Sequence, residues 1–376
     1  MLHNLTLSFL DQYGSLGGGQ QVLLELVVAA LDLGARVTVL APRGPLLAAA
    51  GASGAETRVL PELSLRQGRK GPADMLRLGL WTGGLLARHA RFLSRQELIY
   101  VNGLRCLPAV MGLSAVAGTP FCIHTHLAHC GLERRLLLAA SRQDGCLALV
   151  APSSFAAGVL EQDGRSLPKL RVLENGLGAA FGGLANEDRH SDSPLREVLV
   201  IGRLSPEKGQ DALVEAASAL PGLRFHFLGA ADFADEDFAK ALSRLMPGNA
   251  VFHGRVADVP AAARSLGAQV CLVPSRCAEA FGLAAVEGMA LSCVTAVRDS
   301  GGLAEIAAAT GALRFRADAE ILPLLRSLAD MPGPERAALA RAQHGATLAR
   351  YGHASFAERL RAHLKGLIAA AAAGGR

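Results

Sequence analysis

The 376-residue chain is too long for one ordinary domain, and its 51% of hydrophobic residues is enough for two cores. Its net charge of +5 comes without a module that clusters basic and aromatic residues, which argues against a nucleic-acid partner. The seven cysteines form no CxxC pair and no signal peptide or membrane span is evident, so we expect a cytoplasmic protein with reduced core thiols.

The first half alternates short apolar runs with helical patterns. A glycine-rich loop at 14–20 precedes an amphipathic helix at 21–33, which ends before Gly34. Strands are predicted at residues 2–9, 36–40, 98–101, 121–123 and 147–151. Strands that alternate with helices favour a parallel, doubly wound α/β sheet.

Apolar periodicity lapses over the polar residues 181–194, and the same alternation then begins again. Further strands are predicted at 197–201, 225–228, 250–252, 270–273 and 294–297, with a helix at 211–220. We therefore expect two doubly wound, Rossmann-like domains that face each other across a cleft. The predicted boundaries are an N-terminal domain at 1–182, a linker at 183–195, a C-terminal domain at 196–350, and a last helix at 351–376 that can pack back on the first domain.

Two cations follow the first strand of the second half, in the loop GRLSPEKG. Ligands of doubly wound sheets bind beyond the carboxyl ends of the strands, which is where this loop lies. Arg203 and Lys208 in it suit a pyrophosphate. The alternative is that both are solvated surface cations.

Two glutamates stand in a stretch that is otherwise free of charge from Cys277 to Val297. At about 1.5 Å per helical residue, Glu279 and Glu287 lie roughly a nanometre apart, too far for a retaining glycosidase pair at about 5–5.5 Å. Carboxylates suit the hydroxyls of a sugar or ribose, and the helix that begins after Gly282 favours a phosphate. The alternative is a turn residue and a rim charge.

Three histidines and three glycines are candidates in the first half. His124, His126 and His129 end a strand, and their spacing favours one imidazole at the cleft over a metal triad. Gly17, Gly18 and Gly19 allow a ligand to approach the backbone, but they match neither GxGxxG nor a P-loop. A flexible loop is the alternative.

The order of motifs resembles that of the GT-B-fold retaining glycosyltransferases of glycosyltransferase family 4. The motifs are GGG followed by GARVTVL, then YVNG, VAPSSFAAGVL, VLENGLGAAF, GRLSPEKG, FHGRV, PSRCAEAFGLAAVEGMA and SGGLAEI. The resemblance implies a nucleotide-sugar site in the second domain and an acceptor site in the first. It also implies that the chain needs no cofactor and no essential metal.

The resemblance assigns roles residue by residue. Arg203 and Lys208 hold the diphosphate, Glu287 binds the ribose, and Glu279 contacts the hydroxyls of the donor sugar. The backbone of Phe281, Gly282 and Leu283 contacts phosphate and sugar, Arg255 and Val256 of FHGRV add donor contacts, and His126 lies near the transferred sugar. The chain departs from the family in reading EGMALSC where EAMA, Gly and Pro are usual, so we expect Gly288 and Ser292 to loosen that turn, and Ala280 replaces a commonly smaller Gly.

The predicted function is retaining transfer of a hexose from a UDP- or GDP-sugar to a glycan or lipid-linked acceptor in polysaccharide or glycolipid synthesis. A nucleotide-sugar 2-epimerase and a non-catalytic sugar-nucleotide-binding subunit remain as alternatives. Residues 66–95 are rich in Arg and Leu, and a basic amphipathic segment of this kind can sit on an anionic membrane at the inner face of the cell. The alternative is an ordinary solvated helix face.

Overall fold

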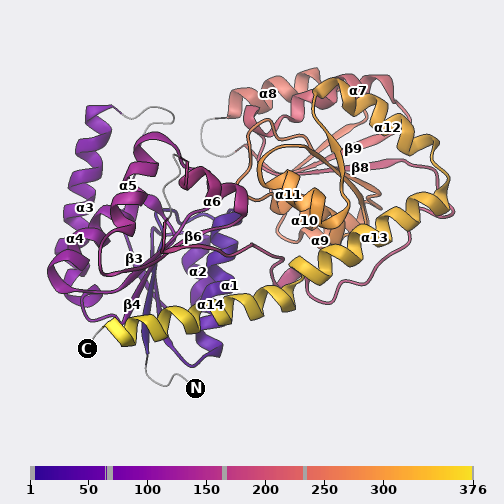
Figure 1. Cartoon of the computed structure of the whole chain (residues 1–376). Coiled ribbons are helices and arrows are strands. Elements are labelled where there is room, and N and C mark those ends of the chain that lie inside the picture. The colour runs from indigo at the N-terminus through magenta and orange to yellow at the C-terminus, as the bar shows by residue number, and fades with distance from the viewer. Residues whose placement is uncertain (1–4, 64, 66–70, 163–166, 232–234, 375–376) are drawn as a thin grey trace. The chain divides into compact units, whose positions relative to one another are not determined.

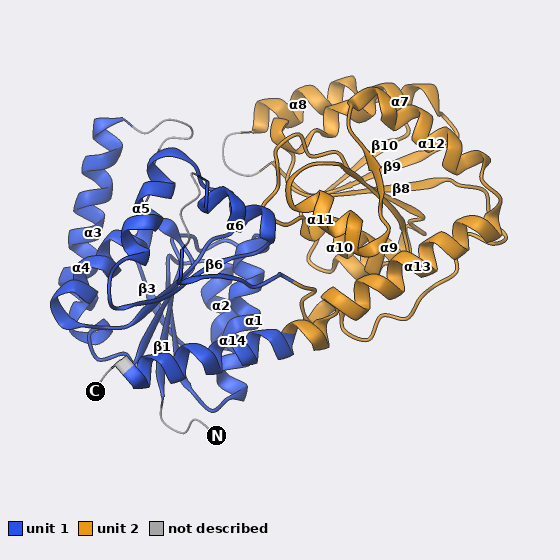
Figure 2. Cartoon of the chain, in the orientation of Figure 1, with its two compact units in different colours: residues 1–175, 357–376 blue, residues 176–356 orange. Residues whose placement is uncertain are grey.

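The computed structural model of the chain (Figure 1) describes residues 5–63, 65, 71–162, 167–231 and 235–374. The chain forms two compact units, coloured separately in Figure 2. Unit 1 comprises residues 1–175 and 357–376, and unit 2 comprises residues 176–356.

Unit 1 is built on a parallel sheet with the strand order β3-β2-β1-β4-β5-β6-β7. The strands are β1 (Thr6–Leu10), β2 (Arg36–Ala41), β3 (Glu56–Val59), β4 (Leu98–Val101), β5 (Phe121–His124), β6 (Cys146–Ala151) and β7 (Leu170–Val172). The order reverses between β1 and β4, and such a switch point opens a crevice beyond the carboxyl ends of the two strands.

Helices flank this sheet, which is why its central strands are apolar on both faces (Figure 1). They are α1 (Gly18–Asp32), α2 (Pro45–Ala52), α3 (Pro72–Leu93), η1 (Leu104–Cys106), α4 (Leu107–Ala117), α5 (Gly131–Ser141) and α6 (Ser154–Leu160). The predicted glycine loop is shorter than expected, because α1 begins at Gly18. The side chain of Gln20 accepts a hydrogen bond from the Gly17 N–H at 3.1 Å and so caps the helix.

Unit 2 repeats the architecture with the strand order β10-β9-β8-β11-β12-β13. Its strands are β8 (Glu197–Ile201), β9 (Arg224–Leu228), β10 (Ala250–Gly254), β11 (Val270–Val273), β12 (Val294–Arg298) and β13 (Leu313–Phe315). Its helices are η2 (Ala179–Phe181), η3 (Pro206–Lys208), η4 (Gln210–Ala212), α7 (Leu213–Ala219), α8 (Glu236–Leu245), α9 (Val259–Ser265), α10 (Leu283–Ala290), α11 (Gly301–Thr310), η5 (Asp318–Glu320), α12 (Ile321–Asp330) and α13 (Gly333–Tyr351). The switch point here lies between β8 and β11.

The predicted α/β class with two doubly wound sheets is confirmed, and the differences are local. Three strands escaped prediction: β3, β7 and β13 are short and lie at the edges of their sheets. The helix predicted at 211–220 begins with the tight turn η4, which a second tight turn, η3, precedes; the two meet at Gly209, with a φ of 69°.

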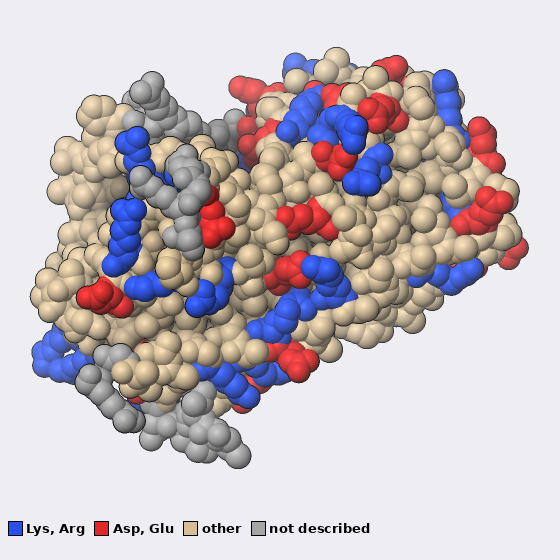
Figure 3. All heavy atoms as spheres, viewed as in Figure 1, with Lys and Arg blue, Asp and Glu red and all other residues tan. Residues whose placement is uncertain are grey.

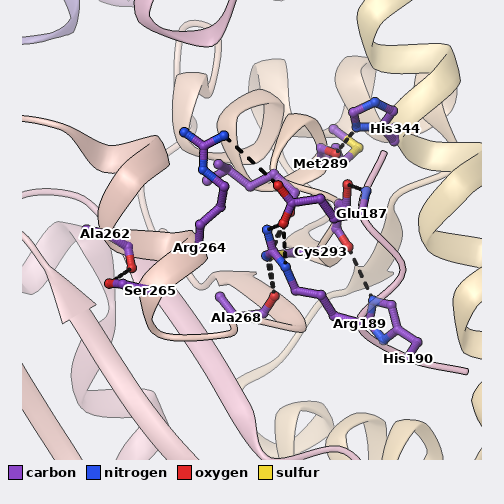
Figure 4. Close-up of polar contacts among 12 residues, drawn as sticks. Glu187, Arg189, His190, Ala262, Arg264, Ser265, Ala268, Met289, Cys293 and His344 are labelled. Carbon is purple, nitrogen blue, oxygen red and sulfur yellow. Dashed lines mark hydrogen bonds and ion pairs between the residues drawn. The ribbon is translucent and has the colours of Figure 1, made fainter. Parts of the chain in front are cut away.

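The polar segment predicted as a linker at 183–195 belongs to unit 2, whose boundary lies earlier, at residue 176. Figure 4 shows how Arg189 and His190 fix it to the body of the unit. The Arg189 guanidinium donates to the carbonyls of Ala268 at 2.9 Å and Leu291 at 3.1 Å. Polarity in this segment therefore comes from side chains that hold the chain in place.

The turn after α10 was expected to be loose, and that expectation is wrong. A Cβ atom on Gly288 would lie 2.6 Å from the Sγ atom of Cys271, so the helix packs tightly on β11. The hydroxyl of Ser292, at a φ of 60°, accepts a hydrogen bond from the Glu187 N–H at 3.0 Å. Both departures from the family pattern are therefore accommodated by close contacts.

The last helix, α14 (His353–Gly374), joins unit 1 from Ala357 onward. His363 on it lies 3.3 Å from the hydroxyl of Tyr100, and Arg361 pairs with Asp32 at 3.0 Å. Five cysteines are buried as expected, whereas Cys130 and Cys277 are exposed. Within the described residues, no helix combines the length and the apolar composition needed to cross a bilayer.

Candidate functional site

A cavity of about 210 Å³ opens at the switch point of unit 1. The loops after β1 and β4 bring Asp11 and Asn102 to it, the last residue of β5 is His124, and His126 follows that strand. Gly19 closes it from the first turn of α1. His126 and Gly19, which belongs to the predicted glycine loop, therefore lie at one cavity.

Asp11 is fully buried at this cavity and is surrounded by hydrogen-bond donors. Its carboxylate accepts from the Tyr13 N–H at 2.8 Å, from Gln20 Nε2 at 3.0 Å and from Asn102 Nδ2 at 2.6 Å. Burial raises the pKa of Asp11, and these hydrogen bonds oppose the rise because they favour the charged form.

His126 lies between Asn102 and the backbone of α1. Its Nε2 atom is 2.7 Å from Asn102 Oδ1, and a Cβ atom on Gly19 would lie 3.0 Å from the imidazole ring. Burial, together with the neighbouring His129, lowers the pKa of His126 to about 4, so the ring is neutral at pH 7. Its buried Nδ1 atom has no hydrogen-bond partner among the described residues.

The other two histidines have partners of their own. His124 Nδ1 lies 3.0 Å from the Tyr100 hydroxyl, and His129 Nδ1 lies 2.7 Å from Glu133. Among the three candidates, His126 is the one whose ring contacts the predicted glycine loop, through Gly19. The described residues contain no group of three or more His, Cys, Asp or Glu side chains placed to hold a metal ion.

In unit 2 the loops that follow β8 and β11 are joined at the switch point. The Glu207 carbonyl accepts hydrogen bonds from the N–H groups of Arg276 at 2.9 Å and Cys277 at 3.2 Å. This contact brings the loop that carries Lys208 beside the loop that carries the predicted sugar-binding Glu279.

The Lys208 ammonium lies 2.8 Å from the Glu279 carboxylate, and Ser275 also donates its hydroxyl to Glu279. Arg203 pairs with Asp235 at 3.1 Å and with Glu207. Each predicted phosphate ligand is therefore held by a carboxylate in this structure. An anion at this edge would have to compete with those carboxylates for the two cations.

The backbone after Glu279 turns directly into helix α10. Gly282 caps the helix with a φ of 120°, a conformation that side chains avoid. Gly302 holds this turn from α11: its N–H donates to the Glu279 carbonyl at 2.7 Å, and a Cβ atom there would lie 2.7 Å from Phe281 Cα. The turn brings Phe281, Gly282 and Leu283 to the first, unpaired N–H groups of α10.

Glu287 lies one turn into α10 and is half-buried. Burial raises the pKa of its carboxyl group to about 7. The carboxyl group makes no hydrogen bond or ion pair with any residue in the described parts of the chain. Among the described residues the carboxylate therefore has no protein partner, and its half-buried position also fits the alternative of a rim charge.

Arg255 and Val256 come from one end of the sheet in strand order. They follow β10, the edge strand, and β9 separates β10 from β8. Arg255 is exposed there and Val256 is half-buried. Val256 packs against the hydrophobic cluster that includes Phe281 of the α10 turn.

Asp11 and Asn102 are functional candidates that the sequence analysis did not single out. Asn102 lies within the YVNG motif, and Asp11 follows the first strand directly. Both positions come immediately after a strand, which is the signal that could have identified them. Their contact could be predicted only with the order of strands in the sheet, because 91 residues separate the two in sequence.

Residues 186–320 match the family model described as Glycosyl transferases group 1. Unit 2 contains a group 1 glycosyl transferase domain. Arg203, Lys208, Glu279 and Glu287 all lie inside the matched range. A search of curated proteins finds no significant match to the chain.

Solved structures resemble the whole chain, including the unit that precedes the group 1 domain. Anabaena HepE in complex with UDP and glucose is 20% identical with a TM-score of 0.78, over 96% of this chain and 99% of HepE. Sucrose-phosphate synthase from Thermosynechococcus elongatus is 18% identical with a TM-score of 0.77, over 97% of this chain and 100% of that one. A glycosyltransferase from Rickettsia africae is 15% identical with a TM-score of 0.73, over 97% and 98%. The chain has the GT-B fold that these likenesses share with it.

Proposed function

We propose that this chain is a retaining glycosyltransferase that moves a sugar from a nucleoside diphosphate sugar to an acceptor hydroxyl. The observation that carries the proposal is the 2.8 Å pair of Lys208 and Glu279 at the β8–β11 switch point, beside the N-terminus of α10. A cation, a helix N-terminus and a sugar-binding carboxylate meet there, which suits a diphosphate with a sugar attached.

The pair suggests how a donor binds. A diphosphate that takes the Lys208 ammonium releases Glu279, whose carboxylate then accepts hydrogen bonds from hydroxyls of the sugar. Arg203, now paired with Asp235 and Glu207, supplies the second cation. Both cations and the α10 N–H groups stabilise charge on the leaving nucleoside diphosphate, so the proposal requires no essential metal and no cofactor.

Glu287 fits the nucleoside end of the donor. Its carboxyl group lacks a partner among the described residues, and a raised pKa of about 7 marks the cost of keeping it charged there. Two vicinal ribose hydroxyls would satisfy both of its oxygens. The predicted ribose contact would thus explain why a glutamate stands at position 287 of an apolar helix.

The proposed nucleotide is uridine diphosphate. HepE, which shares the fold over 96% of this chain, has been solved with UDP and with UDP-glucose. Unit 1 then binds the acceptor, and His126 at its cavity contacts a sugar hydroxyl. Arg255 and Val256, which follow the edge strand β10, are proposed as further donor contacts.

Helix α3 supports a membrane-bound acceptor. Its residues Trp81 and Leu85 are buried, whereas its Leu76 is 66% exposed and its Leu80 is 69% exposed. In Figure 3 the surface over α3 is mostly uncharged, with Lys and Arg side chains beside it. We propose that α3 rests on an anionic bilayer of the cytoplasmic face during polysaccharide or glycolipid synthesis. Arg66, Arg69 and Lys70 of the predicted basic segment lie outside the described residues.

Sedimentation with vesicles tests the membrane contact. Vesicles that contain anionic lipid should bind the wild-type protein in low salt, and Leu76→Ser with Leu80→Ser should abolish binding. Val116→Ser, at a residue of α4 that is 90% exposed, is the matched control and should bind normally. Equal binding by all three proteins would refute a role for α3.

A thermal-shift screen against UDP-, GDP-, ADP- and dTDP-sugars tests the proposed function, because a ligand that binds the native state raises the melting temperature. The donor that binds is then incubated with the protein alone and followed by NMR. Slow hydrolysis with an unchanged sugar supports a transferase, whereas a new epimer identifies the 2-epimerase. Binding without turnover in the presence of candidate acceptors would indicate a non-catalytic subunit.

A further inference from the structure

The side chain of Asp11 acts only as a hydrogen-bond acceptor. A backbone N–H and two side-chain amide groups donate to its two oxygens, so the carboxylate acts only as an acceptor. Its Oδ1 atom serves the Tyr13 N–H, and its Oδ2 atom serves Gln20 and Asn102. Because Tyr13 offers a backbone donor, the orientation of the carboxylate is fixed.

This carboxylate fixes the amide of Asn102. Asn102 Nδ2 donates to Asp11 Oδ2 at 2.6 Å and to the Gly19 carbonyl at 3.3 Å, and both of these atoms are acceptors. A flipped amide would set its oxygen against two other oxygens. Asn102 Oδ1 must therefore face His126.

The amide in turn fixes the tautomer of His126. An amide oxygen 2.7 Å from Nε2 requires a proton on Nε2, so in the neutral ring Nδ1 carries the lone pair. The Nδ1 atom is buried and has no partner among the described residues. The Gly19 backbone holds the ring from the other side, since a Cβ atom there would lie 3.0 Å from it.

We propose that Asp11 and Asn102 are positioning residues that lock His126 as the Nε2–H tautomer, so that Nδ1 accepts a hydrogen bond from a hydroxyl of the bound sugar. The lock itself stands on the contacts within unit 1, and the sugar as its recipient rests on the proposed function. A ring with the opposite tautomer would present an N–H group at Nδ1 and would require an acceptor in the ligand.

Asp11→Asn is the sharpest test, because it keeps the shape and reverses one atom. The new amide must keep its oxygen toward the Tyr13 N–H, so its NH₂ group replaces Oδ2 and faces Asn102. Asn102 then flips, gives up its 3.3 Å hydrogen bond to the Gly19 carbonyl, and offers its own NH₂ group to Nε2, which moves the proton of His126 to Nδ1. Gln20 loses its acceptor on residue 11 as well. Gln20→Met is the control: it removes one donor to Asp11 and leaves the connection to His126 intact.

The tautomer is measured by ¹⁵N NMR of histidine-labelled full-length protein at neutral pH, where a nitrogen without a proton resonates far downfield of one with it. His126→Gln identifies the resonance. We expect Nδ1 to be unprotonated in the wild type and in Gln20→Met, and protonated in Asp11→Asn. A protonated Nδ1 in the wild type overturns the proposal even if Asp11→Asn fails to fold, and an unchanged tautomer in Asp11→Asn overturns it as well.

Activity separates this inference from the proposed function. If the chain is a transferase, Asp11→Asn lowers turnover while UDP binds unit 2 as before, because Asp11 lies in unit 1. A reversed tautomer with unchanged turnover refutes the contact between Nδ1 and the sugar. A wild-type protein that shows the expected tautomer and transfers no sugar refutes the proposed function alone.

Discussion

Replacing Glu287 by Gln is expected to stabilise the protein at alkaline pH while it weakens nucleotide binding. Burial raises the pKa of this carboxyl group from its ordinary value of 4.5 to about 7. The folded state therefore binds the proton more tightly than the unfolded state does. Its contribution to stability is complete below pH 4.5 and is lost as the pH rises through 7.

The magnitude follows from the size of the shift. A pKa difference from 4.5 to about 7 corresponds to about 3 kcal/mol, at about 1.4 kcal/mol for each pH unit. Above pH 7 the wild type carries this cost in full, and Glu287→Gln removes it because the amide is neutral and of similar size. Unit 2 should then melt several degrees higher, since about 1 kcal/mol shifts a domain of this size by roughly 2–4 °C.

The assay is urea or thermal unfolding of both proteins at a series of pH values. The gain in the free energy of unfolding should be near zero below pH 4.5 and should reach its maximum above pH 7. Glu215→Gln, on the exposed face of α7, is the control and should show no such profile. A gain that is the same at every pH, or that grows as the pH falls, would refute the reasoning.

Three further predictions concern the backbone around the two sites and the metal. Gly19→Ala should displace the His126 ring, because its Cβ atom would lie 3.0 Å away, and should shift the ¹⁵N resonances of that ring; an unchanged spectrum contradicts the packing. Gly302→Ala should push Phe281 Cα, now 2.7 Å from the new atom, and lower UDP affinity, whereas Gly222→Ala has open space and should bind as wild type. Dialysis against EDTA should leave transfer activity unchanged, and loss that Mg²⁺ or Mn²⁺ restores would show that charge stabilisation needs a metal.

The motifs of the second half could be predicted because each is continuous in sequence. GRLSPEKG and PSRCAEAFGL each follow a predicted strand and so indicate loops at the carboxyl ends of strands. Charged residues in such loops are candidates for ligand binding. Their contact was harder to foresee, since 71 residues separate Lys208 from Glu279. The family resemblance assigned both residues to one donor site, and their direct contact follows from β8 and β11 being neighbours.

The connection from Asp11 to His126 shows what sequence reasoning lacks. It depends on β1 and β4 being neighbours, and the alternation of strands and helices does not specify the order of strands in the sheet. That Glu287 has no partner among the described residues likewise depends on the side chains around α10, which the sequence pattern does not specify. The edge strands were missed for a different reason: β3 is exposed along its whole length, so it lacks the apolar pattern of a buried strand.

Calorimetric titration of UDP into the wild type, Lys208→Ala and Lys240→Ala tests the central claim most directly. Lys240 is the matched control because it pairs with Glu236 at 3.2 Å on the exposed face of α8, away from the switch point. A lost charge-assisted contact of about 1.5–3 kcal/mol predicts UDP binding that is roughly tenfold to a hundredfold weaker in Lys208→Ala and unchanged in Lys240→Ala. Equal affinity in all three proteins, or no binding to any of them, would contradict a uridine diphosphate site at the β8–β11 switch point.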